Sequence, residues 1–213
     1  MRGAVLAVVL MSAEAFSASR SLDNTGRITV MAGYRYTPNG YFIDKAKAAG
    51  SDYSLVGPGG LYGGASFGYG AFEWCELLID AFVAWEQFKL QGRQEAFTSF
   101  SYGALLGVRI TRNDFPIEGV VPHLGLQVGP VLSIVSSSTE PGTEKVQNGY
   151  MFSAGFTWRF ADRFGLTFDV RYLMARHFVA DIAGMSVGGL MFSLGFTTYF
   201  IPPPKTENEL QLF

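Results

Sequence analysis

Apolar and polar residues alternate along most of this chain with a period of two. In residues 190–200, one parity holds large apolar side chains with Thr198 among them, and the other holds Ser, Gly and Thr between Met191 and Tyr199. A period of two places successive side chains on opposite faces of a β-strand. On this pattern we predict eight strands, at residues 28–36, 61–71, 77–85, 100–110, 122–134, 150–160, 164–172 and 190–200.

The composition of the polar parity indicates which face meets water. It carries small residues together with nine charges: Arg27, Arg35, Glu76, Asp80, Glu86, Arg109, Arg159, Asp169 and Arg171. All five lysines lie outside the predicted strands. Small residues mixed with balanced charges are typical of a narrow barrel interior, whereas the apolar parity then faces lipid. Each Arg facing mid-bilayer lipid would cost roughly 2–4 kcal/mol, which favours this orientation.

The fold class predicted from these faces is all-β: a closed, eight-stranded antiparallel transmembrane β-barrel. Bacterial barrels of this kind have an even number of strands, long extracellular loops and short periplasmic turns. Long connections are expected at residues 37–60 and 135–149, and short ones near residues 72–73 and 161–163. The connection at residues 111–121 is longer than the pattern favours. Pro130 lacks a ladder donor, so we expect a bulge or distortion near it.

The first residues have the features of an export signal. A basic start at Arg2 precedes an apolar run at residues 4–11, and Ala13 and Ala15 provide a small-x-small pattern. We predict a signal peptide at residues 1–15, with cleavage as late as residue 19 also open. The barrel is expected over residues 20–201, followed by a Pro-rich polar tail at residues 202–213. This organisation predicts a protein exported to the bacterial outer membrane.

Three segments carry a family resemblance: residues 121–133 (VPHLGLQVGPVLS), 163–173 (RFGLTFDVRYL) and 194–200 (LGFTTYF). With them, the whole mature chain resembles the small eight-stranded outer-membrane barrels of OmpA and OmpX type, and more broadly the outer-membrane protein beta-barrel domain family. The resemblance implies an inserted barrel whose last strand is the terminal insertion signal. The tail after residue 200 departs from the family pattern, and the motifs imply a fold rather than an activity.

Charge and reactive residues narrow the chemistry. A net charge of −2 provides no basic surface for nucleic acid. One cysteine, Cys75, and two histidines, His123 and His177, form no pattern of metal ligands, so we expect neither a metal nor a cofactor. His123 lies on the interior parity and is expected to be a hydrogen-bonded interior side chain. No nucleophile, base and acid are identifiable together, so we predict that the protein is not an enzyme.

The expected role follows from the filled interior. An eight-stranded barrel has room for its own side chains, so the nine charges with Met31, Leu78, Phe82 and Tyr199 should leave no open channel. We expect a structural or surface-interaction role, with partners that are outer-membrane lipid and lipopolysaccharide and, through the loops at residues 37–60 and 135–149, a surface ligand or partner protein. Two alternatives stay open: an outer-leaflet lipid-modifying enzyme, and a narrow transport or permeability barrel.

Overall fold

The structure is a computed structural model, and it describes residues 24–37, 55–56, 59–90, 96–137, 143–178, 184–186 and 188–200. The predicted signal peptide at residues 1–15 and the tail at residues 202–213 lie outside these ranges. Among the described residues, none forms a helix with the length and apolar character of a membrane span.

All eight predicted strands are present, and each is as long as predicted or longer. They are β1 (Gly26–Tyr36), β3 (Gly60–Phe72), β4 (Cys75–Leu90), β5 (Ala96–Thr111), β6 (Val120–Ser137), β7 (Thr143–Ala161), β8 (Phe164–Met174) and β11 (Gly189–Phe200). Three short strands accompany them: β2 (Leu55–Val56), β9 (Arg176–Phe178) and β10 (Gly184–Ser186). Alternating side chains therefore identified the regular part of the chain.

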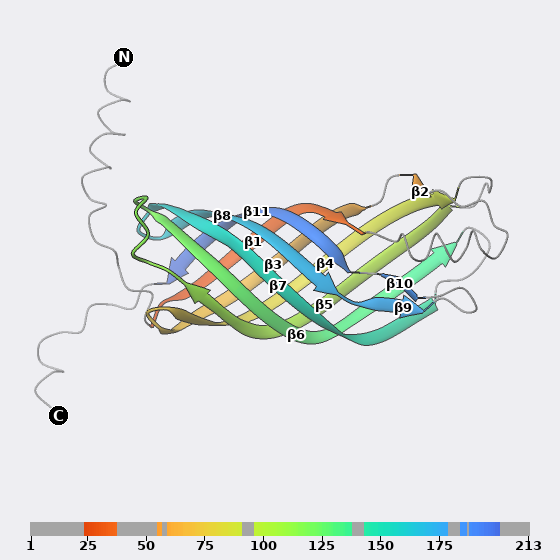
Figure 1. The fold of residues 1–213 in the computed structure, drawn as a ribbon, viewed down its shortest axis with the longest axis horizontal. Coiled ribbons are helices and arrows are strands. Elements are labelled where there is room, and N and C mark those ends of the chain that lie inside the picture. Colours follow the sequence, from red (N-terminus) through yellow and green to blue (C-terminus); the bar gives the residue numbers. More distant parts are fainter. Residues whose placement is uncertain are drawn as a thin grey trace, which may run out of the picture.

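The eight long strands close into an antiparallel barrel, as predicted (Figure 1). β1 pairs with both β3 and β11, and β4 pairs with β5, so every long strand has two neighbours. Following the paired residues once around the barrel from Gly26 leads back to Tyr36, ten residues further along β1. A shear of ten for eight strands tilts them by about 40°, so each residue rises about 2.5 Å along the barrel axis.

The two ends of the barrel differ. At one end, called here the turn end, β1 begins, β11 ends, and residues 73–74, 112–119 and 162–163 connect neighbouring strands. The other end is called the loop end. The bounds expected for the loop at residues 135–149 are wrong, because residues 135–137 belong to β6 and residues 143–149 to β7. These residues show no apolar alternation, since both of their faces carry polar side chains, so their strand character was not recognised.

The distortion expected at Pro130 takes the form of a gap in the ladder. β5 and β6 pair at Gly103 with Val131 and again at Leu106 with Val128, but not between them. The register is the same on both sides of the gap, so the proline interrupts pairing without a bulge. Register shifts occur elsewhere, between Gly70 and Phe72 and between Arg159 and Ala161, both at the turn end.

The two faces of the barrel wall have opposite character. Along β8 and β11, buried and exposed residues alternate at nearly every position. The exposed parity is apolar, with Leu194 at 61% exposure, whereas the buried parity is mostly polar or charged. The barrel is thus inverted relative to a water-soluble protein, and its polar groups are buried in its interior.

Candidate functional site

The barrel interior is the candidate functional site, and the structure places each of the nine predicted charges. Eight of them are buried at 3% exposure or less: Arg27, Arg35, Glu76, Asp80, Glu86, Arg109, Asp169 and Arg171. Arg159 is half-buried at the turn end, where its guanidinium lies 4.6 Å from the centre of the Tyr199 ring. The interior charges form two groups, one in the half nearer the turn end and one at the loop end.

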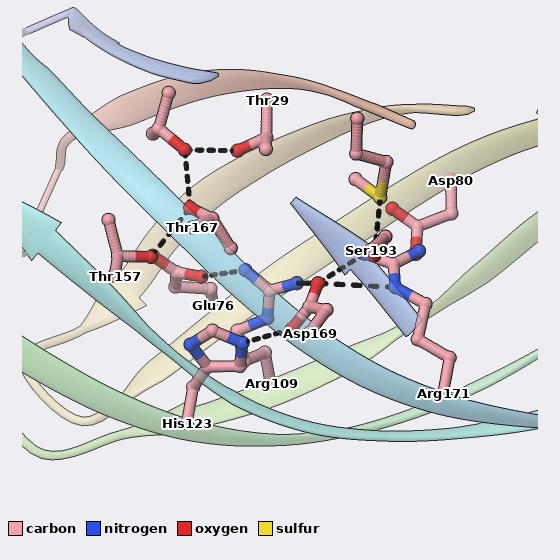
Figure 2. A network of polar contacts seen from close by, with 12 residues as sticks. Thr29, Glu76, Asp80, Arg109, His123, Thr157, Thr167, Asp169, Arg171 and Ser193 are labelled. Carbon is pink, nitrogen blue, oxygen red and sulfur yellow. Dashed lines mark hydrogen bonds and ion pairs between the residues drawn. The ribbon is translucent and has the colours of Figure 1, made fainter. Parts of the chain in front are cut away.

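The larger group begins near the turn end with Glu76 on β4 (Figure 2). Its Oε2 lies 2.8 Å from Nη2 of Arg27 on β1 and 3.8 Å from Nη1 of Arg109 on β5. Arg27 also donates a hydrogen bond from Nε to the same oxygen at 3.0 Å. Glu76 therefore joins two guanidinium groups that come from strands on either side of β4 in the sheet.

Asp169 on β8 continues the group toward the middle of the barrel. Its Oδ2 accepts hydrogen bonds from Nε and Nη2 of Arg171, at 3.1 and 2.7 Å, and lies 3.9 Å from Nη2 of Arg109. Its Oδ1 lies 2.5 Å from Nε2 of His123. Arg171 then reaches Oδ2 of Asp80 at 2.9 Å. Three arginines and three carboxylates thus alternate in sign across the lumen, with His123 attached to the central carboxylate.

Gly155 on β7 leaves room for the contact between His123 and Asp169. A Cβ at this position would meet the Phe168 carbonyl oxygen at 2.1 Å, Oδ1 of Asp169 at 2.6 Å and Nε2 of His123 at 3.0 Å. A carbonyl oxygen cannot move away as a flexible side chain can, so any larger residue would displace β7 or the His123 contact. The small interior residues therefore make space for the polar network.

The second group lies at the loop end around Glu86 on β4. Oε2 of Glu86 accepts hydrogen bonds from Nη2 of Arg35 at 3.1 Å and from Oγ1 of Thr37 at 3.0 Å. Its Oε1 accepts the backbone N–H of Gly59 at 3.0 Å, and Nη1 of Arg35 donates to Oγ of Ser101 at 2.6 Å. Glu86 therefore connects the end of β1 to the residue that precedes β3.

An apolar layer separates the two charged groups. According to the register, six buried side chains lie at levels between Arg171 and Arg35: Tyr62, Phe82, Leu105, Met151, Leu173 and Met191. Tyr62 and Phe82 stack with ring centres 6.4 Å apart. The hydroxyl of Tyr62 points to the ion group, where Nη1 of Arg171 lies 3.3 Å away. Side chains fill this part of the lumen, as expected for an eight-stranded barrel.

Four threonine hydroxyls form a second polar row near the turn end (Figure 2). Thr29 and Thr197 lie 2.8 Å apart, Thr197 and Thr167 2.6 Å, and Thr167 and Thr157 2.9 Å. The row crosses β1, β11, β8 and β7 at one level. Each hydroxyl can donate one hydrogen bond and accept another, so the row satisfies buried polar groups without added charge.

Several polar partners of the buried charges were not predicted from the sequence. Tyr62, Thr37 and Ser101 each contact a buried charge, and all three share the parity of the charges. That parity was the available signal. It did not separate residues that bind a charge from residues that fill space, because the pairing depends on contacts across the lumen.

The other reactive residues contribute little chemistry. His123 is buried and hydrogen-bonded to Asp169, whereas the side chain of His177 lies outside the described residues. Within the described ranges, no cluster of His, Cys, Asp and Glu could hold a metal ion. The Gln127 amide is 1% exposed, and neither of its polar atoms has a hydrogen-bond partner in the described structure.

Comparisons with known proteins bear on the fold. No family model matches the sequence, and no curated protein matches it. Among solved structures, the chain is similar to Ail, the attachment invasion locus protein of Yersinia pestis, with 13% identity over 84% of this chain and 99% of that chain, at a TM-score of 0.50. It is equally similar to the outer membrane protein OprG from Pseudomonas aeruginosa, with 13% identity over 84% and 98% of the two chains and a TM-score of 0.50. The chain therefore has the closed, eight-stranded antiparallel barrel fold that these two structures share.

Proposed function

We propose that this protein is an integral β-barrel of the bacterial outer membrane whose apolar outer face contacts lipid. The observation that carries the proposal is the height of the apolar band. Aromatic side chains face outward at the turn end, including Trp74, Trp158 and Phe164, and again toward the loop end, including Tyr36 and Trp85. The register separates the two belts by about ten residues of rise, or about 25 Å, which is the height of the apolar band in such barrels.

The band between the belts contains no charge. Along the eight long strands, every outward-facing described residue at these levels is uncharged, and most are large and apolar. An apolar surface that encircles a protein on all sides would cause aggregation in water. Lipid is the solvent that makes both faces favourable, because it contacts the apolar exterior while the ion pairs remain shielded inside.

We further propose a structural or surface-interaction role rather than that of an open pore. The apolar layer and the two ion groups occupy the lumen, which supports a closed barrel. The connections at the loop end then provide the contact surface, at residues 37–60 and at the corrected connection between β6 and β7, residues 138–142. Lipid and lipopolysaccharide are the proposed partners of the barrel wall. We propose no catalytic role for the protein, since His123 is buried in the interior near the turn end, away from the outer leaflet.

Insertion and closure can be tested on the purified full chain. We expect β-rich circular dichroism in detergent, a folded form that migrates differently from the heated form on a gel, and no large, steady conductance in a planar bilayer. Loss of the folded form in lipid would contradict the membrane assignment, and steady conductance would contradict closure.

The surface role needs a separate measurement. Replacing residues 38–58 by a short turn should leave the heat-modifiable band unchanged and reduce the attachment of expressing cells to coated surfaces. Unchanged attachment by the folded variant would show that this loop does not provide the contact surface.

A further inference from the structure

At the loop end, β5, β6 and β7 extend further than β8 and β11. β7 pairs with β8 as far as Tyr150 opposite Met174, but it pairs with β6 as far as Thr143 opposite Val135. β5 and β6 are paired over the same extension. We call these outer parts of β5, β6 and β7 the β5–β7 wall, and Figure 1 shows β6 and β7 extending past the ends of β8 and β11.

The outward face of the β5–β7 wall is apolar on β5 and β6 below its upper edge, where it carries Phe100, Tyr102, Leu132 and Ile134. On β7 it carries Val146, with the polar Asn148 two residues further along the strand. The rings of Phe100 and Tyr102 lie 5.7 Å apart, and Val146 is 61% exposed. Outward charge begins with Glu144, which is paired with Ile134 at the upper edge.

The upper part of this face lies above the belt of aromatic residues defined by the other strands. Trp85 of the belt is paired with Phe100, and Phe100 is paired with Ile134. The shear is spread over eight strands, so each step to the next strand raises a paired row by about 3 Å along the axis. Ile134 therefore lies about 6 Å above Trp85. On this side of the barrel, the apolar side chains of β5 and β6 continue beyond the level of Trp85.

A membrane plane perpendicular to the barrel axis at the level of Trp85 would leave Phe100, Ile134 and Val146 in water. These three large apolar side chains on adjacent strands would then lose the favourable transfer that burial provides, at about 25 cal/mol per Å² of apolar area. The face is continuous with the apolar band below it, and the same solvent can cover both. A protein partner would require a separate interface.

We propose that the β5–β7 wall is immersed in the hydrocarbon of the outer lipid leaflet, so that lipid rises higher on this wall than on the neighbouring β3–β4 side. Tilting of the barrel and local thickening of the leaflet are both inexpensive responses to such a mismatch. The wall is then a lipid-contacting surface specific to this chain. This inference rests on the proposed membrane location of the barrel.

Nitroxide spin labels at three positions of the full chain in lipid vesicles test the inference. Labels are attached to Val146→Cys, Gln87→Cys and Leu194→Cys, each in a Cys75→Ser background. Val146 and Leu194 are equally exposed, at 61%, so their labels have comparable freedom. Gln87 faces outward on β4 at about the same level as Val146, which makes it the matched control for height.

Collision rates with oxygen, which partitions into lipid, are compared with rates for a water-soluble nickel chelate. We expect Val146 to resemble Leu194, with oxygen collisions favoured, and Gln87 to show the opposite preference. Equal preferences at Val146 and Gln87, in either direction, would overturn the inference. A water-like result at Leu194 would instead contradict the proposed membrane location, so the two failures are distinguishable. Protection of Val146 from both reagents would indicate a protein partner and would also overturn the inference.

Discussion

Asp169 and Arg171 are two residues apart on β8, and their side chains meet inside the barrel with Oδ2 and Nη2 2.7 Å apart. Because successive inward positions on a strand differ by two, one strand supplies both charges of the pair. The same carboxylate also contacts His123 on β6 and lies 3.9 Å from Arg109 on β5. Asp169 is therefore the point at which three strands are joined through one buried charge.

Replacing Asp169 by Asn should be among the most destabilising conservative changes in the chain. The substitution keeps the shape of the side chain but removes the carboxylate that Arg171 and Arg109 share, so that Asp80 and Glu76 alone face three buried arginines. Removing one partner of a buried pair costs about 3–5 kcal/mol, and we expect a loss of this size in the free energy of unfolding. Urea titration of the protein in lipid vesicles, followed by tryptophan fluorescence, measures it.

Asp114 provides the exposed control. It lies in the turn at residues 112–119, where Arg112 donates a hydrogen bond from Nε at 2.9 Å and thereby lowers the pKa of the Asp114 carboxyl. A lowered pKa stabilises the fold above the ordinary pKa of Asp, and this contribution is lost as the pH falls through the lowered value. Solvent screens this exposed pair, so Asp114→Asn should leave the unfolding curve unchanged at neutral pH. Equal losses for the Asp114 and Asp169 variants would contradict the buried network.

Glu86→Gln should weaken the loop end while the turn end keeps its structure. Glutamine can still accept a hydrogen bond, but Arg35, which is 0% exposed, then loses the negative charge of Glu86. We expect a lower midpoint of thermal unfolding in detergent. Amide exchange should accelerate at Thr37 and Gly59, whose contacts with Glu86 are shown above, and not at Thr29 or Thr197. Unaltered exchange at Thr37 and Gly59 would show that Glu86 does not hold these residues.

Phe82→Ala should open the apolar layer. The Phe82 side chain is 5% exposed, and its ring lies against Tyr62 and beside Gly103. Truncation of a buried Phe to Ala costs about 3–5 kcal/mol and leaves a cavity in the layer that separates the two charged groups. In planar bilayers we expect brief conductance events that are absent from the unmodified protein. Leu194→Ala removes an outward side chain and should produce none.

Gln127→Met should increase stability. The Gln127 amide is buried, and neither its oxygen nor its nitrogen has a protein partner in the described structure. Methionine has a similar length and no strong polar atom, so the substitution removes an uncompensated polar group at little cost in packing. We expect a gain of about 1 kcal/mol in unfolding free energy. A loss of similar size would indicate that the amide is satisfied by ordered water.

The fold and the inward placement of charge could be predicted because each depends on parity alone. Phe168 and Asp169 are neighbours on β8, and alternation places them on opposite faces whatever strand lies beside them. Parity also predicts that Met31, Leu78, Phe82 and Tyr199 face the interior, and all four are buried there.

The partners of each charge could not be predicted, because they depend on the shear. Arg109 approaches Glu76 on β4 and Asp169 on β8, and only the stagger of ten residues brings those strands to the same level. The extension of β7 was not predicted for a different reason. Over residues 143–149 both faces of the strand carry polar side chains. Residues such as Lys145 and Gln147 therefore lack the alternation of apolar and polar positions by which a strand in lipid is recognised.

The central claim is that apolar side chains face lipid while charges face one another inside the barrel. A nitroxide scan along β11, one residue at a time from Leu190 to Phe200 in lipid vesicles, tests it most directly. Oxygen accessibility is predicted to alternate with a period of two, with maxima at Phe192, Leu194 and Phe196 and minima at Ser193, Gly195 and Thr197. Maxima on the Ser193 parity, or uniform accessibility along the strand, would contradict the account.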